Sequence, residues 1–234
     1  MALNRFYKRL FSWDGTGPFM GVSAQSLHAQ PRKHAFPKIH YLLNDPSTPR
    51  LKLKNMELPM PTTGLPVAIH GAVRNNSQDK PTHQEVVAAH AYTSVSNTTR
   101  YFQEMLVKCG KQPLKKWAGV PRLSVYPLAG KDLNAFYSRR AMKFFFAPVG
   151  PKKVLYTVLS SDIVTHETGH ALLDAIRPDF WSVQALEIWS LHESFADIMA
   201  VVSIMQHDEV LNFALEEVDG DISKPNIFSR LAEE

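Results

Sequence analysis

Two histidines and a glutamate stand at a spacing that suits a bound metal ion. The sequence reads His166-Glu167-Thr168-Gly169-His170. On a helix, residues i and i+4 lie on one face, one turn apart, so both imidazoles can bind the same ion. The glutamate at i+1 points toward the open coordination position, where it can deprotonate a metal-bound water whose pKa has fallen toward ~7. We therefore predict a zinc site with Glu167 as general base.

The residues around this motif predict the helix that carries it. The helix should begin near Ser160 or Ser161 and end before Pro178. Two histidines and a glutamate would be costly in an apolar helix without a purpose. The alternative is an amphipathic helix whose motif side chains are solvated and bind no metal. The apolar residues that argue against it are Ile163, Val164, Ala171, Leu172 and Ile176.

A zinc peptidase needs a third protein ligand, and Glu193 is the candidate. It falls on a predicted helix from about Ser190 to Met205, where Ser190 and Glu193 have the spacing of a capping box. Asp197 lies one turn later on the same face and can accept the Nδ1–H of a ligand histidine, which fixes its tautomer. The competing ligands are Asp174, Glu187 and His192.

The rest of the chain predicts a mixed α/β fold. Thr82 and Glu85 form a capping box that starts a long helix from about Thr82 to Cys109, with Gly110 as its stop. Residues 12–80 are rich in Pro, Gly, Ser and Asn, which is typical of loops and short strands. The predicted strands are Leu51–Lys54, Val67–Ala72, Arg122–Tyr126, Ala135–Pro148 and Lys153–Val158.

The composition is that of an ordinary globular protein. The 234 residues carry a net charge of +4 and are 44% hydrophobic. No apolar run of about 18 residues predicts a membrane span, and no signal peptide or nucleic-acid-binding motif is recognisable. The single cysteine, Cys109, cannot form an internal disulfide. We expect a cytoplasmic protein, with secretion left open, while the oligomeric state is not indicated.

Several segments together resemble the gluzincin metallopeptidases, and specifically the thermolysin-like family. The sequence HETGH at 166–170 is followed by HESFAD at 192–197, and these two signals are the specific ones. Upstream, Asn134-Ala135-Phe136-Tyr137 resembles the family's edge strand, which runs along the substrate. Residues 88–92, leading to 100–102, resemble the family's helix before the sheet. The resemblance covers about residues 83–200.

This resemblance implies an α/β (α+β) fold with a zincin-like lobe. That lobe has a twisted, mostly antiparallel sheet, a long helix before it and the HExxH helix beside it. We expect a loop-rich extension with short strands over residues 1–80 and the catalytic lobe over 81–178. Residues 179–234 would begin a helical lobe that supplies the third zinc ligand.

The resemblance also assigns roles to residues. It implies a zinc-dependent metalloendopeptidase that hydrolyses protein or peptide substrates by glutamate-assisted attack of zinc-bound water. Asp197 would orient His166, while Asn134, the backbone of Ala135 and the neighbouring Tyr137 would hold an extended peptide. The implied zinc ligands are His166, His170 and Glu193, with Glu167 as base.

Three departures from the family pattern stand out. His170 and Glu193 are separated by 22 residues (193 − 170 − 1), a few more than is usual. Asp162 matches a family calcium ligand, but no partner carboxylates follow Asp197, which argues against calcium. Most of the C-terminal helical lobe and its oxyanion-stabilising histidine are missing, since His207 comes too early. The alternative function is therefore a catalytically weak or inactive zinc-binding domain, a fragment of a longer peptidase, that acts in protein binding.

Overall fold

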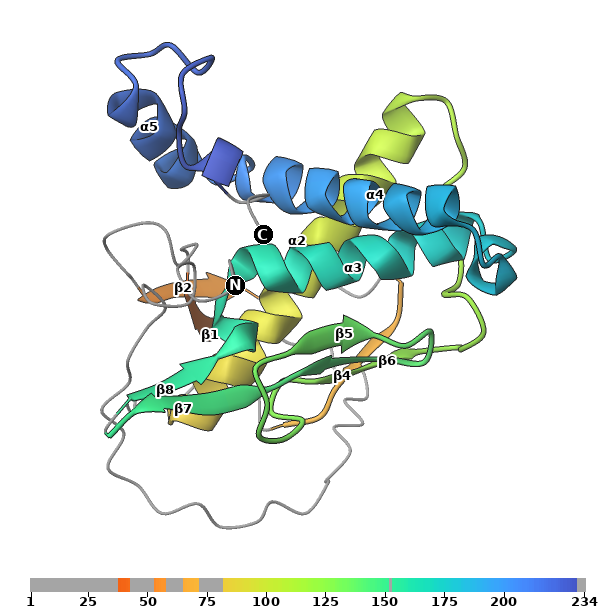
Figure 1. Cartoon of the computed structure of the whole chain (residues 1–234), viewed down its shortest axis with the longest axis horizontal. Coiled ribbons are helices and arrows are strands. Elements are labelled where there is room, and N and C mark those ends of the chain that lie inside the picture. Colours follow the sequence, from red (N-terminus) through yellow and green to blue (C-terminus); the bar gives the residue numbers. More distant parts are fainter. Residues whose placement is uncertain (1–37, 43–52, 58–64, 72–81, 152, 231–234) are drawn as a thin grey trace.

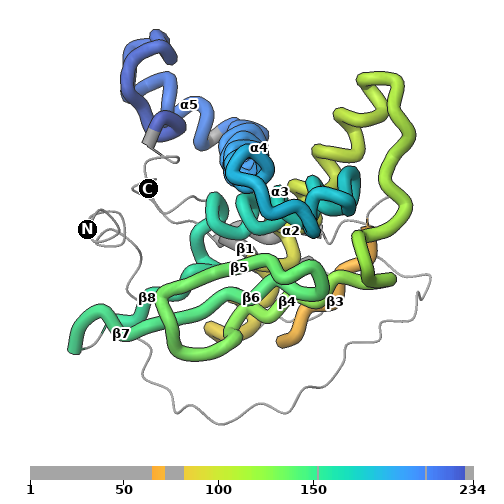
Figure 2. The backbone as a smooth tube through the Cα atoms, turned by 45° about the vertical axis from the view of Figure 1, so that its right-hand side comes forward, coloured from red at the N-terminus to blue at the C-terminus, as the bar shows by residue number. Residues whose placement is uncertain are grey.

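The computed structural model describes residues 38–42, 53–57, 65–71, 82–151 and 153–230. These residues form a mixed α/β fold, as the sequence predicts. Figure 1 shows the helices α3 and α4 stacked above the strands, and Figure 2 shows α3 between the four-stranded sheet and α4. Most of the predicted extension over residues 1–80 lies outside the described residues.

A four-stranded sheet lies below the helices, in the order β3-β4-β6-β5. Two of its three pairings, β3 with β4 and β4 with β6, are parallel, and only β5 with β6 is antiparallel. The prediction of a mostly antiparallel sheet is therefore wrong here. The long segment between β3 and β4 permits parallel pairing, whereas a tight turn joins β5 to β6. The strands are Val67–Ile69, Leu123–Tyr126, Ala135–Tyr137 and Ala141–Phe144 for β3 to β6.

The remaining strands form two antiparallel pairs. β1 (Lys38–Leu42) pairs with β2 (Leu53–Glu57), and β7 (Phe146–Gly150) pairs with β8 (Lys153–Tyr156). The single strand predicted over Ala135–Pro148 is in fact β5, β6 and the start of β7. The chain reverses after β5 because Arg139 adopts a φ of 61°, in the left-handed region that ends an extended run.

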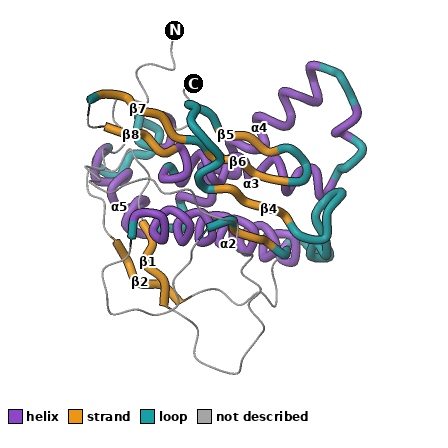
Figure 3. The backbone as a smooth tube through the Cα atoms, turned by 90° about the horizontal axis from the view of Figure 1, so that it is seen from below, coloured by secondary structure: helices purple, strands orange, loops and turns teal. Residues whose placement is uncertain are grey.

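Helix α2 (His83–Lys108) matches its predicted span closely. The capping box is present, since the Glu85 carboxylate accepts a hydrogen bond from the Thr82 backbone N–H (2.7 Å) and the Glu85 N–H donates to the Thr82 hydroxyl (3.3 Å). α2 packs against α3, and Figure 3 shows the two helices and the sheet from below. This long helix is therefore one wall of the main apolar core.

The remaining helices are α3 (Ser161–Ile176), α4 (Leu186–Ile204) and α5 (Asp208–Glu217). Helix α3 has its predicted span, but α4 begins four residues before Ser190 and has Ala185 as its N-cap. The predicted capping role of Ser190 and Glu193 is therefore wrong. Glu193 lies inside the helix, where its backbone N–H needs no cap, and its side chain is free for another role.

Helices α3 and α4 approach closely because α3 carries a glycine at the contact. A Cβ atom added to Gly169 would lie 2.7 Å from the Cα of Ala196. Ala196 is fully buried on α4, one turn after Glu193. The absence of a side chain at Gly169 thus determines how near α4, and the residues it carries, can come to α3.

We predict that Gly169→Ala destabilises the protein and weakens metal binding. The clash is with helix backbone, which cannot move alone, so the cost of about 1–3 kcal/mol should exceed the gain in helix propensity. Urea unfolding and zinc titration measure the two effects. Gly150→Ala is the control, since its added Cβ would meet only the Lys153 side chain at 3.7 Å. Unchanged stability in Gly169→Ala would contradict the account.

Candidate metal centre

His166 and His170 lie one helical turn apart on α3, as the motif spacing requires. Their ring centroids are 4.7 Å apart and their planes are nearly perpendicular. Only 17% and 15% of the two side chains are exposed. Both rings therefore lie at the same partly buried position between α3 and α4.

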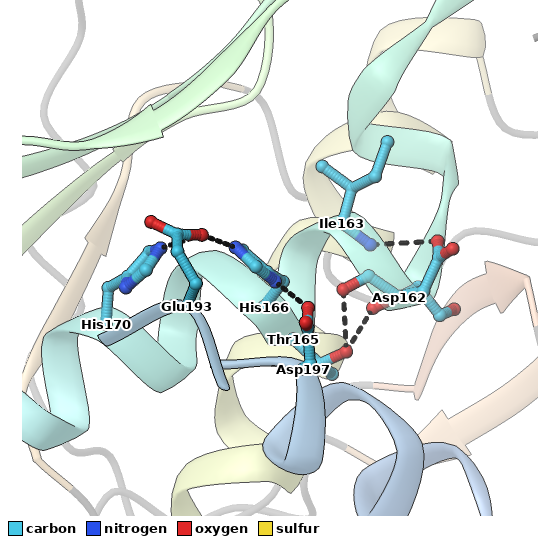
Figure 4. Close-up of polar contacts among 8 residues, drawn as sticks. Asp162, Ile163, Thr165, His166, His170, Glu193 and Asp197 are labelled. Atoms are coloured by element: carbon cyan, nitrogen blue, oxygen red, sulfur yellow. Dashed lines mark hydrogen bonds and ion pairs between the residues drawn. The ribbon is translucent and has the colours of Figure 1, made fainter. Parts of the chain in front are cut away.

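Glu193 on α4 faces both histidines (Figure 4). Its Oε2 atom lies 3.3 Å from the Nε2 atom of His166 and 3.7 Å from the Nε2 atom of His170. One ligand atom from each of the three residues lies within 4.8 Å of the other two, so this group could hold a metal ion. The structure thus brings together the three residues that the sequence predicted as ligands.

These separations can be compared with a tetrahedral site. Ligand atoms about 2.05 Å from a central ion at tetrahedral angles are about 3.3 Å apart. The two nitrogen-to-oxygen distances are close to this value. The Glu193 side chain is 62% exposed, whereas the histidines are largely covered. The spacing of the three donors is therefore compatible with a tetrahedral metal ion, and the Glu193 side of the cluster is exposed to solvent.

Asp197 contacts His166 from one turn further along α4. Its Oδ1 atom lies 2.9 Å from Nδ1 of His166 (Figure 4). A carboxylate accepts here, so Nδ1 donates its proton to Asp197, and this contact leaves Nε2 as the nitrogen that a metal ion would bind. The predicted contact of Asp197 with His166 is present, and its orienting role stays a prediction.

His170 is electrically neutral near pH 7. Burial, followed by the neighbouring His166 and His192, lowers the pKa of its imidazole to about 3. A neutral imidazole is the form that binds metal ions. The contact between His170 and Glu193 is therefore not an ion pair of a protonated histidine.

Glu167, the predicted general base, follows His166 on α3 and is only 7% exposed. Burial of a glutamate is rare unless the carboxylate has a partner or a function. Glu167 is thus a buried carboxylate on the same helix as the two histidines. Its role in proton transfer stays a prediction.

The three competing ligands have other surroundings. Glu187 is exposed at the start of α4. The ring of His192 lies 5.7 Å from that of His170, beside the cluster rather than in it. Asp174 is fully buried and bonded elsewhere. Within the described residues, Glu193 is thus the one of these four candidates that joins the histidines.

Asp174 lies at the centre of a network that the sequence did not predict. The Tyr137 hydroxyl donates a hydrogen bond to its Oδ2 atom (2.8 Å), and Nε of Arg139 lies 3.3 Å from the same atom. Burial raises the pKa of Asp174, and burial together with the Asp174 bond raises the pKa of Tyr137, which stays a protonated donor. The Tyr137 side chain, predicted to bind substrate, thus has a partner inside the protein.

Strand β5 forms the open edge of its sheet beside α3. Phe145 N–H donates to the Asn134 carbonyl (3.2 Å) and Ser138 N–H to the Ala141 carbonyl (2.8 Å), so these residues face β6. By the antiparallel alternation, the backbone groups of Ala135 and Tyr137 point to the open edge. The Ala135 N–H is held there by Oδ1 of Asn134 (2.8 Å). Peptide binding by this edge stays a prediction.

Asp162, which matches the family's calcium ligand, contacts the start of its own helix. Its Oδ1 atom accepts hydrogen bonds from the Ser160 hydroxyl and from the Ile163 N–H (2.8 Å; Figure 4). Such bonds satisfy backbone N–H groups at a helix N-terminus. Among the described residues, Asp162 is in no cluster that could hold a metal.

No protein-family model and no curated protein sequence matches the chain. None of the helices in the described part of the chain is both long and apolar enough to cross a membrane. The described residues thus define a mixed α/β chain with a three-residue cluster able to hold a metal ion.

We predict that Asp197→Ala weakens zinc binding by about 10–100-fold, because His166 loses the acceptor that fixes its ring and tautomer. Competition with a chelating dye measures the dissociation constant. Asp208→Ala, which removes an exposed carboxylate from α5, is the control and should change nothing. An unchanged zinc affinity in Asp197→Ala would show that the orienting contact does not matter.

Tyr137→Phe should destabilise the fold by about 1–3 kcal/mol, because buried Asp174 loses a hydrogen bond. Zinc stoichiometry should stay the same, since neither residue is a ligand. Urea unfolding gives the free energy. Tyr126→Phe keeps the ring stacked on His70 and should cost less than about 0.5 kcal/mol. Equal effects of the two changes would argue against the network.

Proposed function

We propose that this chain is a zinc-dependent metalloendopeptidase of the gluzincin type, similar to the thermolysin-like family. The observation that carries the proposal is the meeting of His166, His170 and Glu193 from two helices, with the Glu193 side of the cluster exposed to solvent. Three protein ligands and an open position are typical of catalytic zinc, whereas structural zinc is usually bound by four protein ligands.

The finer fold proposed is a zincin-like lobe. It is supported by the order of the elements: a long helix, a sheet with an edge strand, the HExxH helix and then a helix with the third ligand. The contact of Asp197 with His166 adds to this support, because orienting carboxylates accompany catalytic histidine ligands.

Zinc, when bound, would polarise a peptide carbonyl and acidify a water molecule. The chain's own residues then have distinct tasks. His166 and Asp197 keep one ligand nitrogen aimed at the ion. Glu167 would accept the proton of the attacking water and pass it to the leaving amine. The two histidines themselves are largely covered by protein.

The open edge of β5 is the proposed support for an extended peptide. Ala135 and Tyr137 present backbone donors and acceptors there, and Asn134 can release the Ala135 N–H when a peptide carbonyl replaces its side chain. Tyr137 also fixes this edge against α3 through Asp174. The strand would thus hold the peptide at a defined distance from the metal ligands.

We predict that Glu167→Gln keeps one zinc per chain but lowers peptide cleavage by about 10²–10⁴-fold, because the amide cannot take a proton. Zinc analysis and hydrolysis of a casein digest on the same samples test this. Glu187→Gln removes an exposed carboxylate outside the cluster and is the control.

The outcomes separate the functions. Cleavage lost only in Glu167→Gln supports the peptidase. One zinc without cleavage in the unaltered protein favours the zinc-binding domain without turnover. Absence of bound zinc after dialysis against the ion would overturn both.

A further inference from the structure

Exposed large apolar side chains are concentrated in residues 181–189, which run from the segment after α3 into the start of α4. Trp181 is 43% exposed, Val183 42%, Leu186 72% and Trp189 55%. Single exposed apolar residues are normal, but four within nine residues form a patch of the kind that marks a binding surface. We call these four residues the apolar surface.

The apolar surface adjoins the metal cluster. Trp189 precedes Glu193 by four residues on α4, so the two side chains lie on the same face of the helix, one turn apart. Leu186 lies almost one further turn away on that face. The surface is thus a continuation of the helix face that carries the third candidate ligand.

It also adjoins the open edge of β5. The Trp181 ring packs edge-on against Tyr137, with centroids 5.7 Å apart, and the Arg139 guanidinium lies 5.6 Å from the Trp181 ring. Tyr137 in turn is bonded to Asp174, one turn after His170 on α3. Trp181, the first residue of the surface, therefore lies at the Tyr137 end of the edge.

The inference takes a peptide that adds to the free edge of β5 in the antiparallel sense, as β6 does on the other edge. β6 pairs antiparallel with β5, and a peptide that pairs antiparallel on the other side would run from the Tyr137 end toward Ala135. Its residues before the scissile bond would then reach the Tyr137 end. These are the residues that the apolar surface would meet.

We propose that the apolar surface binds aromatic or large aliphatic side chains of the substrate, on the N-terminal side of the scissile bond. This inference rests on the proposed peptidase function and names its substrate class. Continuity with both the β5 edge and the Glu193 face selects a peptide as the occupant. Trp181 and Trp189 supply broad apolar contacts that suit such side chains.

The experiment uses the full chain loaded with zinc and a peptide mixture of defined composition. Mass spectrometry of the products maps the cleavage sites, which should be enriched in aromatic or large aliphatic residues before the cut. A peptide pair that differs only by Phe or Ser there then gives a ratio of kcat/KM. We expect Trp189→Ala and Leu186→Ala each to lower this ratio about 10-fold.

Matched variants control for folding. Trp189 and Leu186 are mostly exposed, so thermal unfolding of their alanine variants should be unchanged, whereas Trp181 packs on Tyr137 and is tested as Trp181→Phe as well as Trp181→Ala. Ile222→Ala removes another apolar side chain, 45% exposed and outside this segment, and should leave the ratio unaltered.

Binding gives a second measurement that does not need turnover. The Phe and Ser peptides are labelled with a fluorophore and titrated with the zinc-loaded Glu167→Gln protein, which should bind the Phe peptide more tightly. The double variant Glu167→Gln/Trp189→Ala should bind the two peptides equally. If neither the unaltered protein nor any variant cleaves peptides but this binding pattern is found, the peptidase proposal fails. The proposal that the apolar surface binds aromatic or large aliphatic side chains is then retained.

Two results would overturn the inference alone. One is cleavage with no apolar enrichment, or with enrichment unchanged by Trp189→Ala. The other is a concentration-dependent dimer in light scattering that Trp189→Ala dissociates without altering the ratio, which would make the surface an interface between copies of the chain.

Discussion

The close contact between Gly169 on α3 and Ala196 on α4 determines the geometry of the whole site. Because no side chain separates the helices there, Glu193 comes within 3.7 Å of both ligand nitrogens. A wider spacing would leave the carboxylate in solvent and the histidines without a third group. The small residue inside the motif is therefore as much part of the candidate site as the ligands, although it has no chemistry of its own.

A second constraint holds the sheet against this helix pair. Buried Asp174 receives a hydrogen bond from Tyr137 and lies in an ion pair with Arg139, while Trp181 covers both from the following loop. Removing charge from water is costly, so such a carboxylate persists only with partners. The network thereby joins β5 to the C-terminal end of α3, next to the candidate ligands.

The sequence predicted what depends on local periodicity and missed what depends on distant pairing. The four-residue offsets within 166–170 and 193–197 each place two side chains on one face of a helix. That the two helices meet was predicted because zinc needs a third protein ligand besides the two histidines. The parallel pairings of the sheet depend on which distant strands become neighbours, which no local pattern encodes. The bond between Tyr137 and Asp174 joins residues 37 positions apart with no spacing rule behind it. The predicted start of α4 was four residues too late, because Ser190 and Glu193 have the spacing of a capping box that the helix does not use.

The distribution of ligands over two helices has a thermodynamic consequence. An ion held by both His170 and Glu193 would cross-link the two ends of a 22-residue segment, and closing such a loop restricts the unfolded chain. Ligand binding to the folded state adds to stability in proportion to the logarithm of free ion concentration. Ion occupancy and the integrity of the helix hairpin would thus be one linked equilibrium.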